Sequence, residues 1–179
     1  MINPYLQVAL RHRQDWNWEL REKCVKRYSW AIPSNEALNI ISKYSGIVEM
    51  GAGTGYWSRL LQDMGVSILP FDQHVGEDNT YGHRRSWTTV YRGGDEILSK
   101  FSPSVNLFMC WPPYDTPMAY DCLMSFRGKY LIYVGEGYYG CTGDDRFHCE
   151  LEERWDGVLY QDIPQWYGLN DGLYIYKRR

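Results

Sequence analysis

The 179-residue chain has 44% hydrophobic and 23% charged residues, a balance typical of a compact globular domain and not of a disordered or fibrous chain. At this length, a separate target-recognition domain of ordinary size is not expected. The 19 basic and 22 acidic residues give a formal net charge of −3, which argues against strong non-specific attraction to nucleic acid.

The first 30 residues are more basic than the rest of the chain. Only Asp15, Glu19 and Glu22 oppose the basic residues there. We expect these basic residues to lie on a solvated helix face, and the alternative is contact with a substrate or partner. The basic residues are Arg11, Arg13, Arg21, Lys23, Lys26 and Arg27.

Cysteine usage and hydropathy favour a cytoplasmic protein. The five cysteines are an odd number without a CxxC pair, which favours reduced thiols over a disulfide framework. Cys141, His148 and Cys149 are close in sequence, but no second ligand pair follows at zinc-finger spacing, so no metal is expected. We find no apolar signal-peptide core and no stretch of about 18 apolar residues, so neither secretion nor membrane insertion is expected.

The N-terminal part of the sequence predicts two helices. Residues 14–29 show amphipathic spacing and predict a leading helix. Pro33 interrupts this pattern, and Ser34 is placed to cap a second helix over residues 36–44. We therefore divide the sequence into a helical extension, residues 1–32, and a main domain, residues 33–179.

After Gly46, short apolar runs alternate with helical stretches, which predicts a parallel sheet covered by helices. The last two strands flank a turn-rich segment and predict an antiparallel pair. The fold class is therefore α/β: a Rossmann-like three-layer sandwich with a mostly parallel seven-stranded sheet and an antiparallel C-terminal strand pair. The predicted strands are residues 47–50, 66–71, 87–91, 105–110, 130–134, 158–163 and 173–176. The predicted helices of this part are residues 56–64, 95–101, 117–126 and 144–155.

A glycine-rich loop follows the first predicted strand. The sequence Val48-Glu-Met-Gly-Ala-Gly-Thr-Gly-Tyr-Trp57 places an acidic residue at the end of a strand and a GxGxG loop before a helix. Glycines allow the backbone to turn and to approach a ligand closely. A dinucleotide site requires GxGxxG, and Tyr56 stands where its last glycine would be, so this spacing disfavours NAD.

An adenosyl cofactor with a methionine tail suits this loop better. Such a cofactor has no phosphate, and Glu49 beside the loop complements positive ammonium and sulfonium groups. Asp72 ends the second predicted strand, where a carboxylate can accept hydrogen bonds from both ribose hydroxyls. The alternative for Asp72 is an ordinary turn residue.

These motifs resemble those of class I S-adenosylmethionine-dependent methyltransferases. The resemblance rests on Glu49-Met-Gly-Ala-Gly-Thr-Gly55, Asp72, Gly94-Asp95 and the order of elements over residues 33–179. It implies S-adenosylmethionine as the cofactor, with Glu49 at the methionine amine and Asp72 at the ribose. It further implies that Gly51 and Gly53 pass close to the cofactor and that Asp95 approaches the adenine amine; the alternative for Asp95 is a helix cap. The other residues expected at the cofactor are Ala52, Gly55, Tyr56, Trp57 and Cys110.

A second informative loop, Cys110-Trp-Pro-Pro-Tyr114, lies at the end of a mostly apolar predicted strand. Two consecutive prolines make a rigid loop and present carbonyls without competing amide donors. The loop resembles the Pro-Pro-aromatic motif of amino-methyltransferases that act on adenine, cytosine or glutamine amides. In those families, Asp, Asn or Ser before the prolines accepts a hydrogen bond from the target amine. Here that residue is Trp111, whose side chain offers only a donor.

The same loop is the predicted acceptor site. We expect Tyr114 to stack on a flat substrate and the carbonyls near Pro112 and Pro113 to accept from an amine or guanidine. Trp111, Pro112, Pro113 and Tyr114 are therefore predicted to contact the acceptor. The alternative is a kinked exit from the strand with no chemical role.

Glu136 follows the next predicted strand between two glycines. We expect its carboxylate to orient a cationic or hydroxyl-bearing substrate or to act as a base, and the alternative is a plain mobile loop. Trp166 and Tyr167 are expected to cover the same opening or to form an exposed turn. We predict surface positions for His74, His83, Arg84 and Arg85.

The sequence therefore predicts a methyltransferase that uses S-adenosylmethionine and acts on a small or flat acceptor, with a nitrogen nucleophile or a nucleobase-like molecule as the expected type. A nucleic-acid acceptor is not favoured, because the net charge is negative. Two alternatives remain: a non-catalytic protein that binds S-adenosylmethionine, and a nucleotide-binding oxidoreductase.

Overall fold

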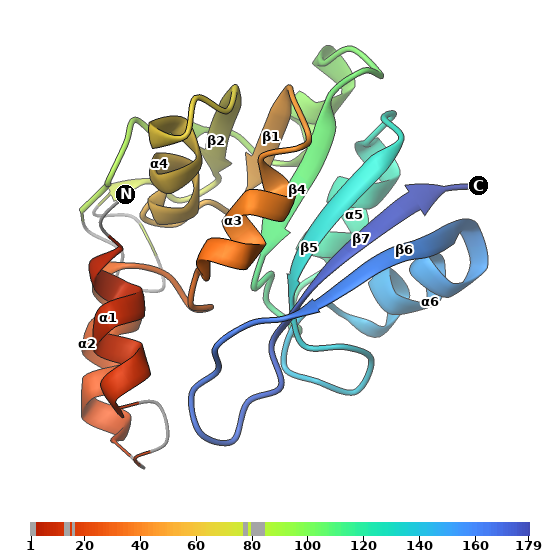
Figure 1. Ribbon diagram of the computed structural model, residues 1–179. Helices are drawn as coiled ribbons and strands as arrows, with labels where there is room; N and C mark the ends of the chain where they lie inside the picture. Colours follow the sequence, from red (N-terminus) through yellow and green to blue (C-terminus); the bar gives the residue numbers. More distant parts are fainter. Residues whose placement is uncertain (1–2, 13–14, 16, 77–78, 80–84) are drawn as a thin grey trace.

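Seven strands form one sheet in the computed structural model, which describes residues 3–12, 15, 17–76, 79 and 85–179 (Figure 1). The strand order is β3-β2-β1-β4-β5-β7-β6. Strands β1 to β5 are parallel, and β7 is antiparallel to both β5 and β6. The predicted fold class is confirmed. The strands are β1 (Ile47–Met50), β2 (Ile68–Asp72), β3 (Tyr91–Arg92), β4 (Asn106–Cys110), β5 (Tyr130–Gly135), β6 (Trp155–Asp162) and β7 (Gly172–Arg178).

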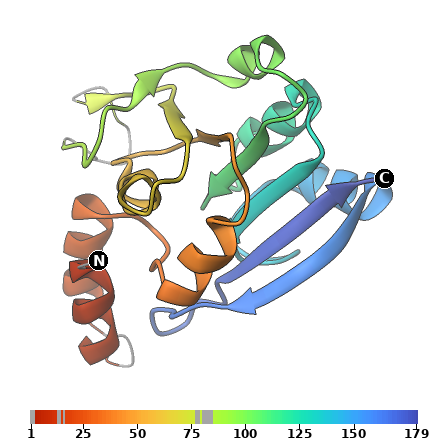
Figure 2. The ribbon, with the colours of Figure 1, turned by 45° about the horizontal axis from the view of Figure 1, so that its top comes forward.

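Helices cover both faces of this sheet (Figures 1 and 2). The 3-10 helix η2 stands where the sequence predicts an α-helix over residues 95–101. Ser34 caps α3 as predicted, because its Oγ accepts a hydrogen bond from the Ala37 amide at 3.0 Å. The helices are α1 (Pro4–His12), α2 (Trp18–Arg27), α3 (Asn35–Ile41), α4 (Tyr56–Asp63), η2 (Asp95–Lys100), α5 (Met118–Ser125) and α6 (Asp145–Arg154).

The alternation of side chains along the strands builds two apolar layers. Val48 pairs with Leu107, and Leu107 pairs with Leu131, so these three side chains share one face and pack with η2, α5 and α6. The adjacent residues Ile47 and Phe108 belong to the opposite layer, which packs against α3 and α4. Strands buried on both faces are expected to be mainly apolar, as β4 is from Leu107 to Met109.

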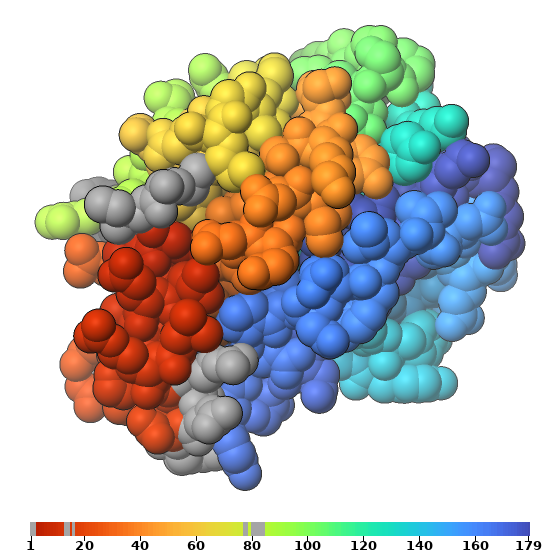
Figure 3. Space-filling model, in the orientation of Figure 1, coloured from red at the N-terminus to blue at the C-terminus, as the bar shows by residue number. Residues whose placement is uncertain are grey.

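The N-terminal helices join one of these layers. Tyr5 and Ala9 of α1 are fully buried, and Tyr5 stacks on Tyr28 with ring centres 5.0 Å apart. The Tyr5 hydroxyl accepts a hydrogen bond from Trp166 Nε1 at 2.9 Å. Figure 3 shows the N-terminal helices in red directly against the blue C-terminal connection. The segment therefore lies over the end of the sheet where the parallel strands finish.

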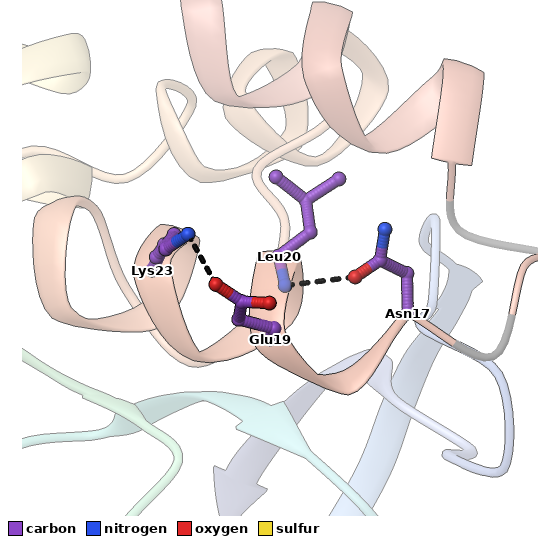
Figure 4. A network of polar contacts seen from close by, with 4 residues as sticks. All are labelled: Asn17, Glu19, Leu20 and Lys23. Atoms are coloured by element: carbon purple, nitrogen blue, oxygen red, sulfur yellow. Dashed lines mark hydrogen bonds and ion pairs between the residues drawn. The ribbon is translucent and has the colours of Figure 1, made fainter.

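On its outer face, α2 is polar. Asn17 caps the helix by accepting from the Leu20 amide at 3.0 Å, and Lys23 pairs with Glu19 at 2.6 Å (Figure 4). Lys26 forms a second exposed pair with Glu22. The prediction of a solvated basic face therefore holds for these lysines.

Several predicted elements are wrong in extent or kind. The leading helix predicted over residues 14–29 begins only at Trp18, and α1 precedes it unpredicted; Trp16 lies outside the described residues. The third strand contains only Tyr91–Arg92, because the Trp87 amide instead donates to Thr54 O at 2.7 Å. Helix α6 ends at Arg154, so Trp155 belongs to β6 and not to the helix. The helix predicted over residues 36–44 ends at Ile41, and the helix predicted over residues 95–101 has 3-10 geometry.

Candidate functional site

The candidate site lies at the carboxyl ends of β1, β2 and β4. The strand order reverses between β1 and β4, and open α/β sheets bind ligands at such a switch point. The predicted glycine loop follows β1, and the Trp-Pro-Pro-Tyr loop follows β4. The fold therefore brings the two sequence motifs to one edge.

Three glycines of the loop adopt positive φ, which only glycine tolerates at low cost. The φ values of Gly51, Gly53 and Gly55 are 72°, 54° and 70°. A Cβ on Gly51 would stand 2.7 Å from Met118 Cε, and one on Gly55 would stand 2.9 Å from Val90 Cγ2. The loop thus needs glycine for both its conformation and its close packing.

Asp72 is tied to this loop. Its Oδ2 accepts a hydrogen bond from the Gly53 amide at 2.8 Å, and its Oδ1 accepts from the His74 amide at 2.9 Å. Each carboxylate oxygen can accept more than one hydrogen bond, so both retain acceptor capacity. The structure places the predicted ribose-binding carboxylate directly beside the glycine loop.

Glu49 lies beneath the loop and is 2% exposed. Its Oε2 accepts a hydrogen bond from Ser58 Oγ of α4. Burial, together with the nearby Asp72, raises the pKa of Glu49 to about 8. Burial and the proximity of Glu49 also raise the pKa of the Cys110 thiol, at the end of β4. A cationic ligand at this position would favour the charged carboxylate.

Asp95 is the first residue of η2, which Gly94 precedes as N-cap. The Asp95 Oδ2 atom accepts a hydrogen bond from Ser125 Oγ of α5 at 2.9 Å. The side chain therefore does not cap its own helix, and the alternative that the sequence left open for Asp95 is wrong.

Trp111 adopts a strained conformation. Its φ of 55° is unusual for a bulky residue, and its indole stacks on Trp30 at 4.9 Å with an interplanar angle of 7°. The indole Nε1 donates a hydrogen bond to Asp171 Oδ1 at 2.6 Å. Among the described residues, the other non-glycine residue with positive φ is Tyr139, in the loop after β5. Strain of this kind clusters at functional sites.

The rest of the loop is anchored by its backbone. Pro112 O accepts from the Gly143 amide at 2.9 Å, and Pro113 forms an isolated bridge with Thr142. Tyr114, in contrast, is 60% exposed. One predicted carbonyl acceptor is thus already engaged, while the Tyr114 ring remains accessible.

Glu136 holds two loops together. Its Oε2 accepts from the Cys141 amide at 2.6 Å, and its Oε1 accepts from the Asn170 amide at 2.8 Å. The side chain is 5% exposed. These contacts join the loop after β5 to the connection between β6 and β7.

Arg21 reaches the site from α2 and is 7% exposed, so the predicted solvated position is wrong for this residue. Its guanidinium carbon lies 4.8, 5.5 and 5.8 Å from the ring centres of Trp18, Trp30 and Trp111. Burial lowers the pKa of Arg21. The contact with Trp111 could not be predicted from the sequence, because the two residues are 90 positions apart.

Asp171 was not among the predicted site residues. It is 1% exposed, and burial raises its pKa to about 7. In the sequence it belongs to Asn170-Asp-Gly172, a typical turn signal, and the turn interpretation concealed it. A buried carboxylate beside Trp111 is a stronger site signal than the turn motif.

The remaining residues that the sequence analysis singled out have mixed positions. The side chains of Tyr56 and Trp57 are 1% exposed and belong to the core. Trp166 is buried against Tyr5, while Tyr167 is 58% exposed. His74 and Arg85 are exposed, whereas His83 and Arg84 lie outside the described residues.

Two further features of the described residues concern metals and membranes. In the described part of the chain, no cluster of three or more His, Cys, Asp or Glu residues could hold a metal ion. No helix among the described residues has the length and apolar character needed to cross a membrane.

No protein-family model matches the chain, and no curated protein matches it. Solved structures resemble it at low sequence identity. Magnesium protoporphyrin IX methyltransferase from Synechocystis, solved with bound S-adenosylmethionine, has 9% identity and a TM-score of 0.53, covering 99% of this chain and 93% of its own. The methyltransferase domain of bacterial CtHen1-C has 9% identity and a TM-score of 0.51, covering 80% of this chain and 95% of its own.

A third similar structure is the glycopeptide N-methyltransferase MtfA in complex with S-adenosylhomocysteine. It has 12% identity and a TM-score of 0.50, covering 80% of this chain and 89% of its own. These similarities define the fold of the chain as the Rossmann-like fold of class I methyltransferases.

Proposed function

We propose that the protein is a methyltransferase that uses S-adenosylmethionine and acts on a small or flat acceptor, with a nitrogen atom as nucleophile. One arrangement carries this proposal: Asp72 accepts from the Gly53 amide while Glu49 is buried beneath the same loop. Two carboxylates at one glycine loop suit a ligand that has a ribose, a cationic tail and no phosphate.

In the proposal, each cofactor group meets one part of this arrangement. Glu49 holds the methionine amine, Asp72 holds the ribose hydroxyls, and Asp95 approaches the adenine amine. Gly51, Ala52, Gly53 and Gly55 contribute backbone, as do Tyr56 and Trp57, whose side chains are in the core. Cys110 borders the methionine end, because its sulfur lies near Glu49.

The cofactor, when bound, supplies a methyl group on a sulfonium with a good leaving group. The protein then mainly needs to align the acceptor and exclude water, which can be worth about 7–11 kcal/mol in the best cases. Tyr114 offers an exposed ring for a flat acceptor, and the anchored Trp111-Pro-Pro loop fixes its position.

Glu136 has a positioning role in this proposal. Both of its oxygens accept from backbone amides, so the carboxylate stabilises the loops around the acceptor site. The sequence alone favoured an orienting group or a base at this position. The buried hydrogen bonds favour the positioning role.

Calorimetric titration with S-adenosylmethionine, S-adenosylhomocysteine and NADH tests the cofactor assignment. We expect micromolar binding of both adenosyl ligands and none of NADH. Binding of NADH alone would support the oxidoreductase alternative. Binding of the adenosyl ligands without methyl transfer to any acceptor would support the non-catalytic alternative, which the presence of Trp111 before the prolines keeps open.

A further inference from the structure

Two buried polar atoms without a hydrogen-bond partner among the described residues lie around Trp111. They are Asp171 Oδ2 and Arg21 Nε. Asp171 and Arg21 are 1% and 7% exposed, and an unpaired buried polar atom costs about 1–3 kcal/mol. A ligand atom that satisfies such a group recovers this cost.

The geometry gives Asp171 a fixed direction. Trp111 Nε1 donates to Asp171 Oδ1 at 2.6 Å, and the indole is itself held by the stack on Trp30. The preceding amide, of Asn170, donates to Glu136 Oε1 at 2.8 Å. Hydrogen bonds therefore fix both the Asp171 side chain and the backbone next to it, while Oδ2 has no hydrogen-bond partner among the described residues.

The other carboxylates of the site have other roles. Each oxygen of Glu136 accepts a backbone amide, and the proposed function assigns Glu49 and Asp72, beside the glycine loop, to the cofactor. Arg21 is the one buried Arg or Lys in the described part of the chain. The surroundings of Trp111 thus combine several carboxylates with one guanidinium, which favours a neutral donor of hydrogen bonds over a phosphate-bearing molecule.

We propose that Asp171 accepts the hydrogen bond of the acceptor N–H group, the role for which Trp111 has no side-chain acceptor. This inference rests on the proposed function and narrows its substrate to a planar, phosphate-free compound with an N–H group. The acceptor nitrogen forms the new N–CH3 bond with its lone pair and releases its proton to Asp171 Oδ2. The electron pair of the broken S–CH3 bond remains on sulfur.

This role differs from that of Glu136, although both residues are buried acids on neighbouring loops (Figure 1). Asp171 Oδ2 has no hydrogen-bond partner among the described residues, whereas each oxygen of Glu136 accepts a backbone amide. The titratable groups whose charges act on Asp171, or on which it acts, are Tyr5, Arg21, Cys110, Tyr133, Glu136, Cys141 and Tyr174.

The first arm of the test needs no acceptor. In protein labelled with ¹⁵N-tryptophan, the Trp111 indole resonance is assigned by its loss in Trp111→Phe. We expect this resonance to shift with pH around a midpoint of about 7 in the wild type and to stay constant in Asp171→Asn. A resonance that ignores pH in the wild type, or titrates equally in the variant, overturns the proposal.

The second arm measures transfer from S-adenosylmethionine with a deuterated methyl group to the low-molecular-mass fraction of a cell extract. We expect a product labelled on nitrogen in a planar, phosphate-free compound. Asp171→Asn and Asp171→Ala should each lower kcat by about 100-fold while the Kd for S-adenosylmethionine changes less than about twofold. The control Asp162→Asn changes an exposed carboxylate at the end of β6 and should match the wild type.

Unimpaired transfer by Asp171→Asn overturns the role of Asp171, as does a labelled product that carries phosphate. If the wild type binds S-adenosylmethionine but labels nothing, the proposed function fails as well. The indole titration then still reports separately on the contact between Trp111 and Asp171. The two failures are therefore distinguishable.

Discussion

At the scale of single residues, the burial of Glu49 determines how its carboxyl group responds to a positively charged ligand. Its pKa of about 8 means that the carboxyl group is largely protonated near pH 6 without ligand. A neutral carboxyl attracts an ammonium group weakly, whereas the ionised form attracts it strongly. Because a bound cation favours the charged form, binding should release the Glu49 proton below pH 8.

We therefore expect the Kd for S-adenosylmethionine to fall as the pH rises from 6 to 8 and to level off above that range. Calorimetry at several pH values measures this directly. Glu49→Gln should bind about 10- to 100-fold more weakly at pH 8.5, since a hydrogen bond to a charged group is worth about 1.5–3 kcal/mol. The ligand's own titration is common to both proteins, so equal pH profiles would contradict the assignment.

Also at the scale of single residues, variants of Asp72 and Tyr114 test the division between the cofactor site and the acceptor site. Asp72→Ala removes the acceptor that holds the Gly53 amide and, in our proposal, the ribose. It should raise the Kd for S-adenosylmethionine by at least about tenfold. Tyr114→Ala removes an exposed ring, so it should leave that Kd within about twofold and reduce methyl transfer. Calorimetry combined with a transfer assay checks both, and equal behaviour of the two variants would refute the division.

At the scale of elements, the features predicted correctly from the sequence are those that depend on residues close together in the chain. Strand β1 was predicted with its observed bounds, and the glycine loop was identified from spacing alone. The contacts of Arg21 and Asp171 with Trp111 were not predictable, since they join residues 90 and 60 positions apart. Helix α1 was missed because only Tyr5 and Ala9 are buried in it, too few for a clear periodic pattern.

The start of α4 provides a test of loop packing. Gly55 and Gly46 have φ of 70° and 66°, so both resist an L side chain equally on backbone grounds. Only Gly55 is crowded, because its Cβ would meet Val90 and Thr88 at 2.9 and 3.0 Å, whereas Gly46 has nothing within 4 Å. Gly46→Ala should cost about 1–2 kcal/mol of unfolding free energy, the strain of a left-handed conformation.

Gly55→Ala should cost about 1–3 kcal/mol more than Gly46→Ala, because overpacking adds to the strain. Urea unfolding of both variants at one temperature gives the comparison. Equal losses would mean that Thr88 and Val90 move aside freely, and that the connection before β3 does not constrain the glycine loop.

At the scale of the whole molecule, the N-terminal helices and the sheet share a core. Tyr5 packs with Tyr28 and Tyr56 and accepts a hydrogen bond from Trp166, which belongs to the connection between β6 and β7. The segment before Pro33 also places Arg21 and Trp30 against Trp111. This packing joins the N-terminal segment to the connection between β6 and β7 beside the candidate site, so we propose that residues 1–32 fold together with residues 33–179.

Tyr5→Ala tests this coupling. Removing a fully buried aromatic ring should lower the free energy of unfolding by about 3–5 kcal/mol, whereas Leu10→Ala, an exposed position of the same helix, should cost less than about 0.5 kcal/mol. Far-ultraviolet circular dichroism and tryptophan fluorescence should give coincident urea transitions in all three proteins. A separate extension would instead unfold in its own transition, and Tyr5→Ala would then leave the main transition unchanged while abolishing the minor one.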